Sequence, residues 1–211
     1  MFDVETTRLI EEDVEAEDME VSVACATWLP AAASVAESMA SAASRAFWPS
    51  AVTRDPSGGE AAPVSSLLEW FDGARVIVAY NGRAFDMRVL RSAYGDDEAR
   101  WQAHGAKLVD PMEAVQRATG RRAKLSTLLA LNTRTAKAGA GCDAPRWWGE
   151  GRLAQLERYC AQDVRALADL VTRTEIRLPG LATTREASVV RELRHSTGGT
   201  QHTQQQCESD A

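Results

Sequence analysis

Hydrophobic and polar residues alternate from the second residue of the chain onward. Phe2 and Val4 are apolar and would lie on one face of an extended strand, while Asp3 and Glu5 would lie on the other. Residues 20–28 combine small and β-branched side chains and predict a second strand, which a proline soon ends. Because two carboxylates on one strand face repel each other, the pattern predicts either a solvated face or a bound cation.

From residue 65 onward, predicted strands alternate with predicted helices. The apolar run 75–80 predicts a strand that is buried on both faces, and residues 107–110 predict a shorter one. Apolar spacing and helix-start signals predict helices over 66–71, 84–93, from Pro111 onward, 125–131 and 152–173. This alternation predicts an α/β domain with helices on both faces of its sheet.

Three segments give weaker patterns. The acidic run 11–20 predicts a solvated loop or hairpin tip, with a second metal site as the less favoured alternative. Residues 31–60 are rich in Ala, Ser, Gly and Pro; we expect a helix over 31–45 and no clear third strand. Residues 179–211 predict a disordered tail, which leaves a single domain over 1–178.

Charge is divided unevenly along the chain. The chain has 211 residues, 45% of them hydrophobic, which fits one domain with a buried core. The formal net charge is −6, but residues 1–70 carry 13 acids and 3 bases, whereas residues 71–211 carry 17 acids and 21 bases. The acidic part contains the two strand carboxylates, and the basic part could contact phosphate.

The cysteines indicate an intracellular protein. They are scattered, with no paired spacing for zinc and no disulfide framework, at Cys25, Cys142, Cys160 and Cys207. No signal peptide precedes the first predicted strand, and the uncharged stretch 21–36 is shorter than a membrane-spanning helix requires. We therefore expect a soluble, cytoplasmic protein with reduced thiols and no membrane partner.

Acidic residues recur in two later segments. Asp86 lies in the first turn of the helix that follows a buried strand, and Tyr159 and Asp163 are four residues apart on one helix face. If both segments met Asp3 and Glu5, four carboxylates would share one cleft, and oxygen ligands of this kind select Mg²⁺ or Mn²⁺ over zinc. Taken singly, an acid pair on a strand is usually a solvated face, and a tyrosine–aspartate pair is usually a helix surface.

Three motifs follow one another along the chain: Asp3-Val4-Glu5-Thr6, Asn81 with Phe85-Asp86, and Tyr159-x-x-x-Asp163. In this order they resemble the motifs of the DEDD superfamily of ribonuclease-H-like 3′–5′ exonucleases of the proofreading type. The tyrosine indicates the DEDDy branch, because the other branch has histidine in the third motif and none of His104, His195 and His202 lies there. Just before that motif, Trp147-Trp148 and Gly151-Arg152 resemble a bacterial subset found with helicases.

The resemblance implies a ribonuclease-H-like mixed β-sheet flanked by helices, and hydrolysis at the 3′ end of DNA or RNA with two Mg²⁺ or Mn²⁺ ions. Asp3 would bridge both ions, Glu5 and Asp163 would complete the ligands of the first, and Asp86 would hold the second, through water. Tyr159 would orient the attacking water, since a pKa near 10 makes it a poor base. These five residues are the predicted catalytic residues.

The resemblance also implies substrate contacts from Thr6, Asn81 and Phe85. Asn81 could instead cap a turn, and Phe85 could belong to the core. A stretch without acids, 114–142, is either a phosphate track or a solvated face; its bases are Arg117, Arg121, Arg122, Lys124, Arg134 and Lys137. The expected partner is nucleic acid with a single-stranded 3′ end, and a helicase or polymerase is a possible second.

Two rival functions remain open at this point. The first is a catalytically silent exonuclease fold that binds nucleic acid as an adaptor for a helicase or polymerase. The second is a metal-dependent phosphodiesterase that acts on small nucleotides. A protein that binds single strands but never shortens them would favour the first, and comparing a dinucleotide with a long oligomer tests the second.

Overall fold

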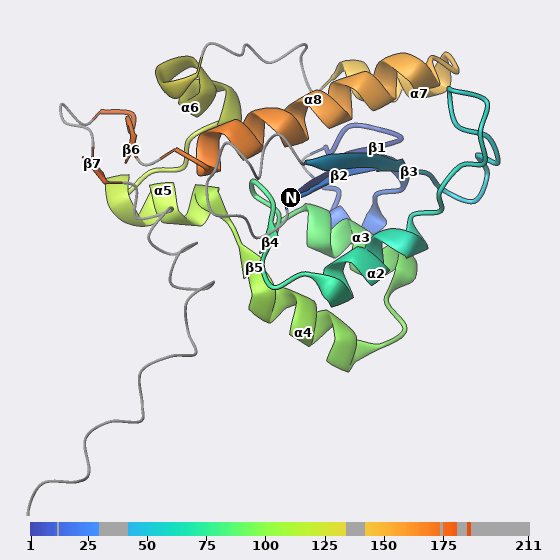
Figure 1. Ribbon diagram of the computed structural model, residues 1–211, viewed down its shortest axis with the longest axis horizontal. Helices are drawn as coiled ribbons and strands as arrows, with labels where there is room; N and C mark the ends of the chain where they lie inside the picture. The colour runs from blue at the N-terminus through green and yellow to red at the C-terminus, as the bar shows by residue number, and fades with distance from the viewer. Residues whose placement is uncertain (12, 30–41, 134–141, 174, 181–184, 187–211) are drawn as a thin grey trace, which may run out of the picture.

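The computed structural model describes residues 1–11, 13–29, 42–133, 142–173, 175–180 and 185–186. Strands and helices follow one another along the chain (Figure 1). In order they are β1 (Phe2–Thr6), the 3-10 helix η1 (Ala16–Asp18), β2 (Val21–Trp28), β3 (Ala43–Phe47), α2 (Ser65–Gly73), β4 (Ile77–Val78), α3 (Asp86–Tyr94), α4 (Glu98–Lys107), β5 (Leu108–Val109), α5 (Pro111–Thr119), α6 (Leu125–Asn132), α7 (Asp143–Gly149), α8 (Leu153–Val171), β6 (Glu175–Ile176) and β7 (Arg185–Glu186).

The described strands include both antiparallel and parallel pairs. β1, β2 and β3 form an antiparallel sheet in that order, and β4 and β5 form a parallel pair. Across β1 and β2, Asp3 lies opposite Cys25 and Glu5 lies opposite Val23. Since helices alternate with these strands, the predicted α/β class is confirmed.

Helices cover both faces of the antiparallel sheet. Figure 1 shows α8 and α7 over one face, with α2 and α3 against the other. On the α2–α3 face, Phe2 and Val4 belong to one hydrophobic cluster. On the α8 face, Val23 and Cys25 pack with residues of α7 and α8 in another. Because side chains alternate along a strand, β1 directs its apolar residues to α2 and α3 and its two acids to α8.

β3 corrects the expectation for the alanine-rich segment. The predicted helix over 31–45 is wrong at its C-terminal end, because residues 43–47 pair with β2 at five positions. Backbone pairing with β2 and full burial of Phe47 outweigh the helix preference of an alanine-rich stretch. The absence of a third strand was therefore also a wrong expectation. The remainder of the predicted helix, 31–41, lies outside the described residues.

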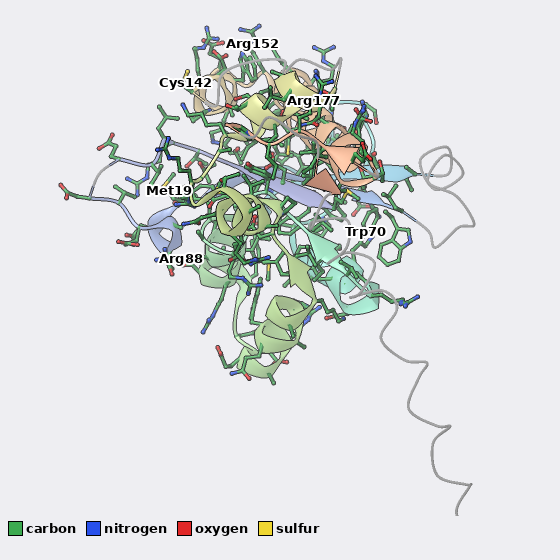
Figure 2. All side chains as sticks on the ribbon, turned by 90° about the vertical axis from the view of Figure 1, so that its left-hand side faces the viewer. Met19, Trp70, Arg88, Cys142, Arg152 and Arg177 are labelled. Atoms are coloured by element: carbon green, nitrogen blue, oxygen red, sulfur yellow. The ribbon has the colours of Figure 1, made fainter. Side chains whose placement is uncertain are left out.

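The described residues of the acidic run, 11 and 13–20, form a loop that docks on α3. Its short helix η1 is held there by Arg88, which pairs with Glu15 at 2.8 Å and with Glu17 at 2.6 Å. Figure 2 shows Arg88 and Met19 on the side of the molecule where this loop lies. These acids meet an arginine, so the structure favours the loop over the alternative of a second metal site.

α4 was not predicted from the sequence. Its buried residues are Trp101 and His104, so its hydrophobic periodicity is weak. The available signal was Asp97, whose side chain accepts a hydrogen bond from the N–H of Arg100 at 3.0 Å and caps the helix. His104 fixes α4 to α2, because its Nε2 lies 2.6 Å from Oδ1 of Asp72.

Three further predictions concern the C-terminal tail, membrane-spanning helices and the cysteines. Of the predicted tail, 179–211, only residues 179–180 and 185–186 are described. In the described part of the chain, no helix combines the length and apolar character that a bilayer crossing needs. Cys25, Cys142 and Cys160 are free thiols, and Cys207 lies outside the described residues.

Candidate metal centre

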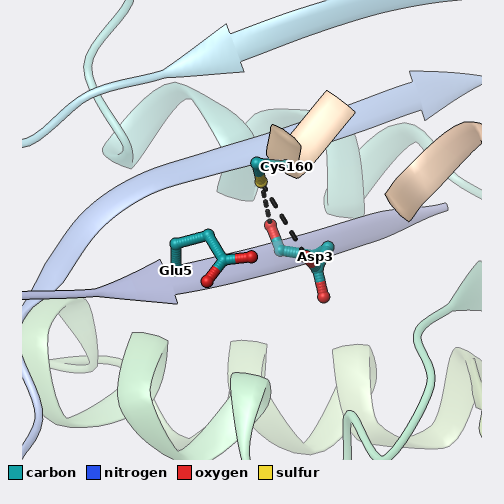
Figure 3. A group of neighbouring side chains, drawn as sticks. All are labelled: Asp3, Glu5 and Cys160. Atoms are coloured by element: carbon teal, nitrogen blue, oxygen red, sulfur yellow. Dashed lines mark hydrogen bonds between the residues drawn. The ribbon is translucent and has the colours of Figure 1, made fainter. Parts of the chain in front are cut away.

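Asp3 and Glu5 lie on the face of β1 that α8 covers, and Cys160 meets them from α8 (Figure 3). One ligand atom from each of these three residues lies within 4.8 Å of the other two. The thiol of Cys160 donates to the backbone carbonyl oxygen of Asp3 at 3.6 Å and to its Oδ2 at 3.9 Å. We refer to Asp3, Glu5 and Cys160 as the candidate metal centre.

The candidate metal centre offers oxygen ligands with a neutral thiol beside them. Burial raises the pKa of the Cys160 thiol well above its usual value, and Cys25 and the charges of Asp3 and Glu5 raise it further. A neutral thiol donates a hydrogen bond but is a poor ligand for a hard cation. The two carboxylates are partly exposed, so a hydrated ion can reach them. This donor set fits a divalent cation that prefers oxygen.

Asp86 reaches β1 along the edge that β2 leaves open. Met1 and Thr27 exchange two backbone hydrogen bonds of 2.8 Å, so the odd-numbered residues of β1 bond to β2 and the Val4 N–H points to the other edge. Oδ1 of Asp86 accepts that N–H at 2.9 Å. The carboxylate is therefore fixed to the strand one residue away from each of the two acids.

Asp86 is an unusual carboxyl group because it is 3% exposed. Burial raises its pKa to about 7; the hydrogen bond from the Val4 N–H lowers it and the charge of Asp110 raises it. A divalent cation nearby would favour the ionised form and would reverse this shift. A bound ion would therefore change the protonation state of Asp86.

The third predicted motif lies on the buried face of α8. Tyr159 is 3% exposed and Asp163 is 4% exposed, and both share this face with Cys160. The ring of Tyr159 meets the ring of Trp147 on α7 at 5.4 Å and 68°. Among the described residues, Asp86 and Asp163 do not belong to the group whose ligand atoms lie within 4.8 Å of one another.

The turn that leads into α3 depends on close backbone packing. Asn81 has a φ of 62°, in the left-handed region that asparagine adopts more readily than most residues. A Cβ at Gly82 would lie 2.3 Å from the Cβ of Ala79, so only glycine fits without a backbone shift. The buried carboxylate of Asp110 accepts the N–H of Asn81 at 2.9 Å and that of Met112 at 3.0 Å. Asp110 therefore holds this turn and caps α5 at the same time.

The three predicted substrate contacts have different surroundings. Thr6 is buried, and its hydroxyl donates to the carbonyl oxygen of Arg8 at 2.8 Å. Phe85 is partly buried against the hydrophobic cluster of the α2–α3 face. Asn81 forms the turn, and its Oδ1 accepts a hydrogen bond from Arg122. Of the three, Thr6 contacts the backbone of a basic residue, whereas Asn81 is joined to a basic side chain.

Sequence reasoning missed two residues of this site. Cys160 lies three positions before Asp163 in a predicted helix, so helical spacing alone could have placed it on the same face. Asp110 precedes Pro111, and aspartate followed by proline is a frequent helix start. No local signal shows that its carboxylate reaches Asn81, which is 29 residues away.

Comparisons with known proteins identify one family. No curated protein and no solved structure matches the chain. The sequence model of the RNase H superfamily matches residues 44–175, which include Asp86, Tyr159 and Asp163 and begin after β1. The match indicates a nuclease that acts on nucleic acid, and nucleases of this kind usually use divalent metal ions. The match covers more than half of the chain, so the chain belongs to the RNase H superfamily.

Proposed function

We propose that this chain is a metal-dependent 3′–5′ exonuclease of the DEDDy type. The observation that carries the proposal is the meeting of two motifs at β1. Asp3 and Glu5 project from the strand, and Asp86 is bonded to the Val4 N–H between them across 82 residues of sequence. The carboxylates of Asp3 and Glu5 repel each other unless a cation offsets their charge, and the contact with Val4 holds the carboxyl group of Asp86 at the same strand.

Asp3, Glu5, Asp86 and Asp163 would hold two Mg²⁺ or Mn²⁺ ions. When bound, such ions would lower the pKa of a water molecule and stabilise the leaving oxygen of the displaced nucleotide. The carboxylates suit such hard ions, which prefer the oxygens of Asp3 and Glu5 to the sulfur of Cys160. The low exposure of Asp86 supports the same role, since a cation would favour its ionised form.

Residues of α8 would position the reacting groups. Cys160 donates to both oxygen-bearing groups of Asp3 and so restricts the rotation of that carboxylate. Tyr159 would orient the attacking water through its hydroxyl, with its ring held against Trp147. A tyrosine hydroxyl can both donate and accept a hydrogen bond, which suits it to orienting a water molecule.

Cleavage of end-labelled oligonucleotides tests the proposed direction and metal dependence. With Mg²⁺, a single strand labelled at its 5′ end should give a ladder of shortened products, and a chelator should stop the reaction. A circular single strand of the same composition is the control and should stay intact. Cleavage of the circle, or cleavage that persists in chelator, would contradict the proposal. Binding of the strand without shortening in either metal would indicate an adaptor instead.

A pair of variants on α8 tests the residue assignment. Asp163→Asn should abolish nucleotide release, because it removes a charged ligand from a buried position. Asp169→Asn is the matched control, since Asp169 lies on the same helix and pairs with Arg173 at 3.1 Å. We expect the control to retain the activity of the unmodified protein. Full activity in Asp163→Asn would remove Asp163 from the site.

A further inference from the structure

The loop between α5 and α6 carries three bases within four positions. We define residues 120–124 as the basic loop; its charged residues are Arg121, Arg122 and Lys124, all exposed. None of the three forms an ion pair with another residue in the described part of the chain, whereas Arg83 and Arg117 pair with Glu113 at 3.2 and 3.9 Å. We propose that the basic loop binds phosphate groups of the nucleic-acid strand, with Arg122 at its centre.

Side-chain contacts fix the basic loop beside the turn that precedes α3. The hydroxyl of Tyr80 donates to the carbonyl oxygen of Ala123 at 2.6 Å. Arg122 donates to Oδ1 of Asn81, and its Nε donates to Sδ of Met112 at 3.0 Å. The loop is therefore anchored at the C-terminal end of β4, where polar groups of α/β proteins converge on ligands.

The turn also connects the basic loop to β1. Asn81, which bonds to Arg122, lies five residues before Asp86, and Asp86 bonds to the backbone of β1. If the 3′ end of a strand lies against Asp3 and Glu5, these contacts lead along the turn from that end to the basic loop, where the proposal places the neighbouring phosphates. The inference rests on the proposed function, since it names the path that the strand takes away from the proposed site.

Arg122 is suited to phosphate by its remaining donors. A guanidinium has five N–H donors in a planar fork, and two contacts, to Asn81 and Met112, leave the others for a ligand. Those contacts also restrict the side chain, so binding loses less conformational entropy than it would with a free arginine. Phosphate contacts of this kind position a strand without reading its bases. The loop would therefore serve DNA and RNA of any sequence.

Salt-dependent binding of a fluorescent single-stranded oligonucleotide tests the inference. Measured by anisotropy in Ca²⁺, Arg122→Ala should weaken affinity about tenfold at moderate salt. The slope of log affinity against log salt concentration should fall by about 0.7, the value for one lost phosphate contact with a single strand. Arg91→Ala is the matched control, because Arg91 is an exposed arginine that already pairs with Glu98. Its affinity and slope should stay unchanged.

A second variant guards against a folding effect of Arg122→Ala. The side chains of Arg121 and Lys124 have no hydrogen bond to another described residue, so Arg121→Ala with Lys124→Ala should fold normally and lower the slope by about 1.4. An unchanged slope in both variants would overturn the inference. If the protein never shortens the strand yet both variants lower the slope, the proposed function is wrong, but the inference that the basic loop binds phosphate is supported. If the protein shortens the strand but neither variant changes the slope, the proposed function is supported and only the inference about the basic loop is wrong.

Discussion

The two faces of β1 differ in what surrounds them, although they belong to the same five residues. On the face toward α2 and α3, Phe2 and Val4 are 1% and 4% exposed and belong to the hydrophobic core. On the face toward α8, Asp3 and Glu5 are partly exposed and lie against the thiol of Cys160. Alternate side chains of this short strand therefore serve different purposes: those on one face stabilise the fold, and those on the other carry the proposed chemistry. Substitutions on one face should change unfolding, and those on the other should change activity.

The largest effect should come from Asp3→Asn. Nucleotide release in Mg²⁺ should fall by about 1,000-fold or more, which corresponds to about 4 kcal/mol of transition-state stabilisation. The free energy of unfolding without metal should change by less than about 1 kcal/mol, because the substitution removes a charge that repels Glu5. Initial rates and urea unfolding measure the two quantities. An activity within tenfold of that of the unmodified protein would contradict the proposal that the α8 face of β1 carries the activity.

Phe2→Ala should produce the reverse outcome. The ring of Phe2 is 1% exposed and lies 4.7 Å from that of Phe71, so its loss leaves a cavity. The free energy of unfolding should fall by about 3–5 kcal/mol, measured by urea unfolding. Leu9→Ala is the control; Leu9 is 50% exposed, and its effect should stay within about 0.5 kcal/mol. Equal effects of the two substitutions would show that the α2–α3 face is not the stabilising one.

Asp86, at the open edge of β1, should make the free energy of unfolding depend on pH. Its pKa is raised from 3.8 to about 7, so the folded state binds the proton more tightly and is favoured at acidic pH. Without metal, this stabilisation of up to about 4 kcal/mol should be lost as pH rises from about 4 through about 7. Asp86→Asn keeps an acceptor for the Val4 N–H but cannot titrate, so its stability should fall less over this range. Urea unfolding at several pH values compares the two; identical slopes would contradict the raised pKa.

The smallest effect should come from Tyr159→Phe. The substitution keeps the ring contact with Trp147, so the free energy of unfolding should change by less than about 1 kcal/mol. Nucleotide release should slow by about tenfold if the hydroxyl orients water. Tyr94→Phe, at a partly buried tyrosine of α3, is the matched control and should leave the rate unchanged. A normal rate in Tyr159→Phe would leave the tyrosine with a packing role only.

Much of the fold was predictable from local pattern. The alternation in β1 predicted which of its residues are buried, and apolar spacing together with helix-start signals predicted α3, α5 and α8. β3 was not predictable, because its backbone conformation is set by pairing with β2 rather than by its alanine-rich sequence. α4 was missed because its buried face is confined to Trp101 and His104.

The candidate site was predictable as a set of residues but not as an arrangement. The order of the three motifs singled out five residues, and their catalytic roles stay predictions. The contact of Asp86 with the backbone of β1 depends on which strand edge β2 leaves open, which is a property of the sheet. The thiol beside Asp3 depends on how α8 crosses that sheet. Neither relation has a signature at short range in the sequence.

Asp110 ties together two segments that a substrate would touch at different points. Its carboxylate is 4% exposed and accepts N–H groups from the turn at Asn81 and from the first turn of α5. The turn and α5 therefore cannot shift independently without leaving a buried carboxyl group short of hydrogen-bond donors. Because α5 runs directly into the basic loop, Asp110 gives that loop a second connection to the turn before α3, beside the contact of Arg122 with Asn81. The two connections would keep a bound strand and the turn that leads to Asp86 at a constant separation.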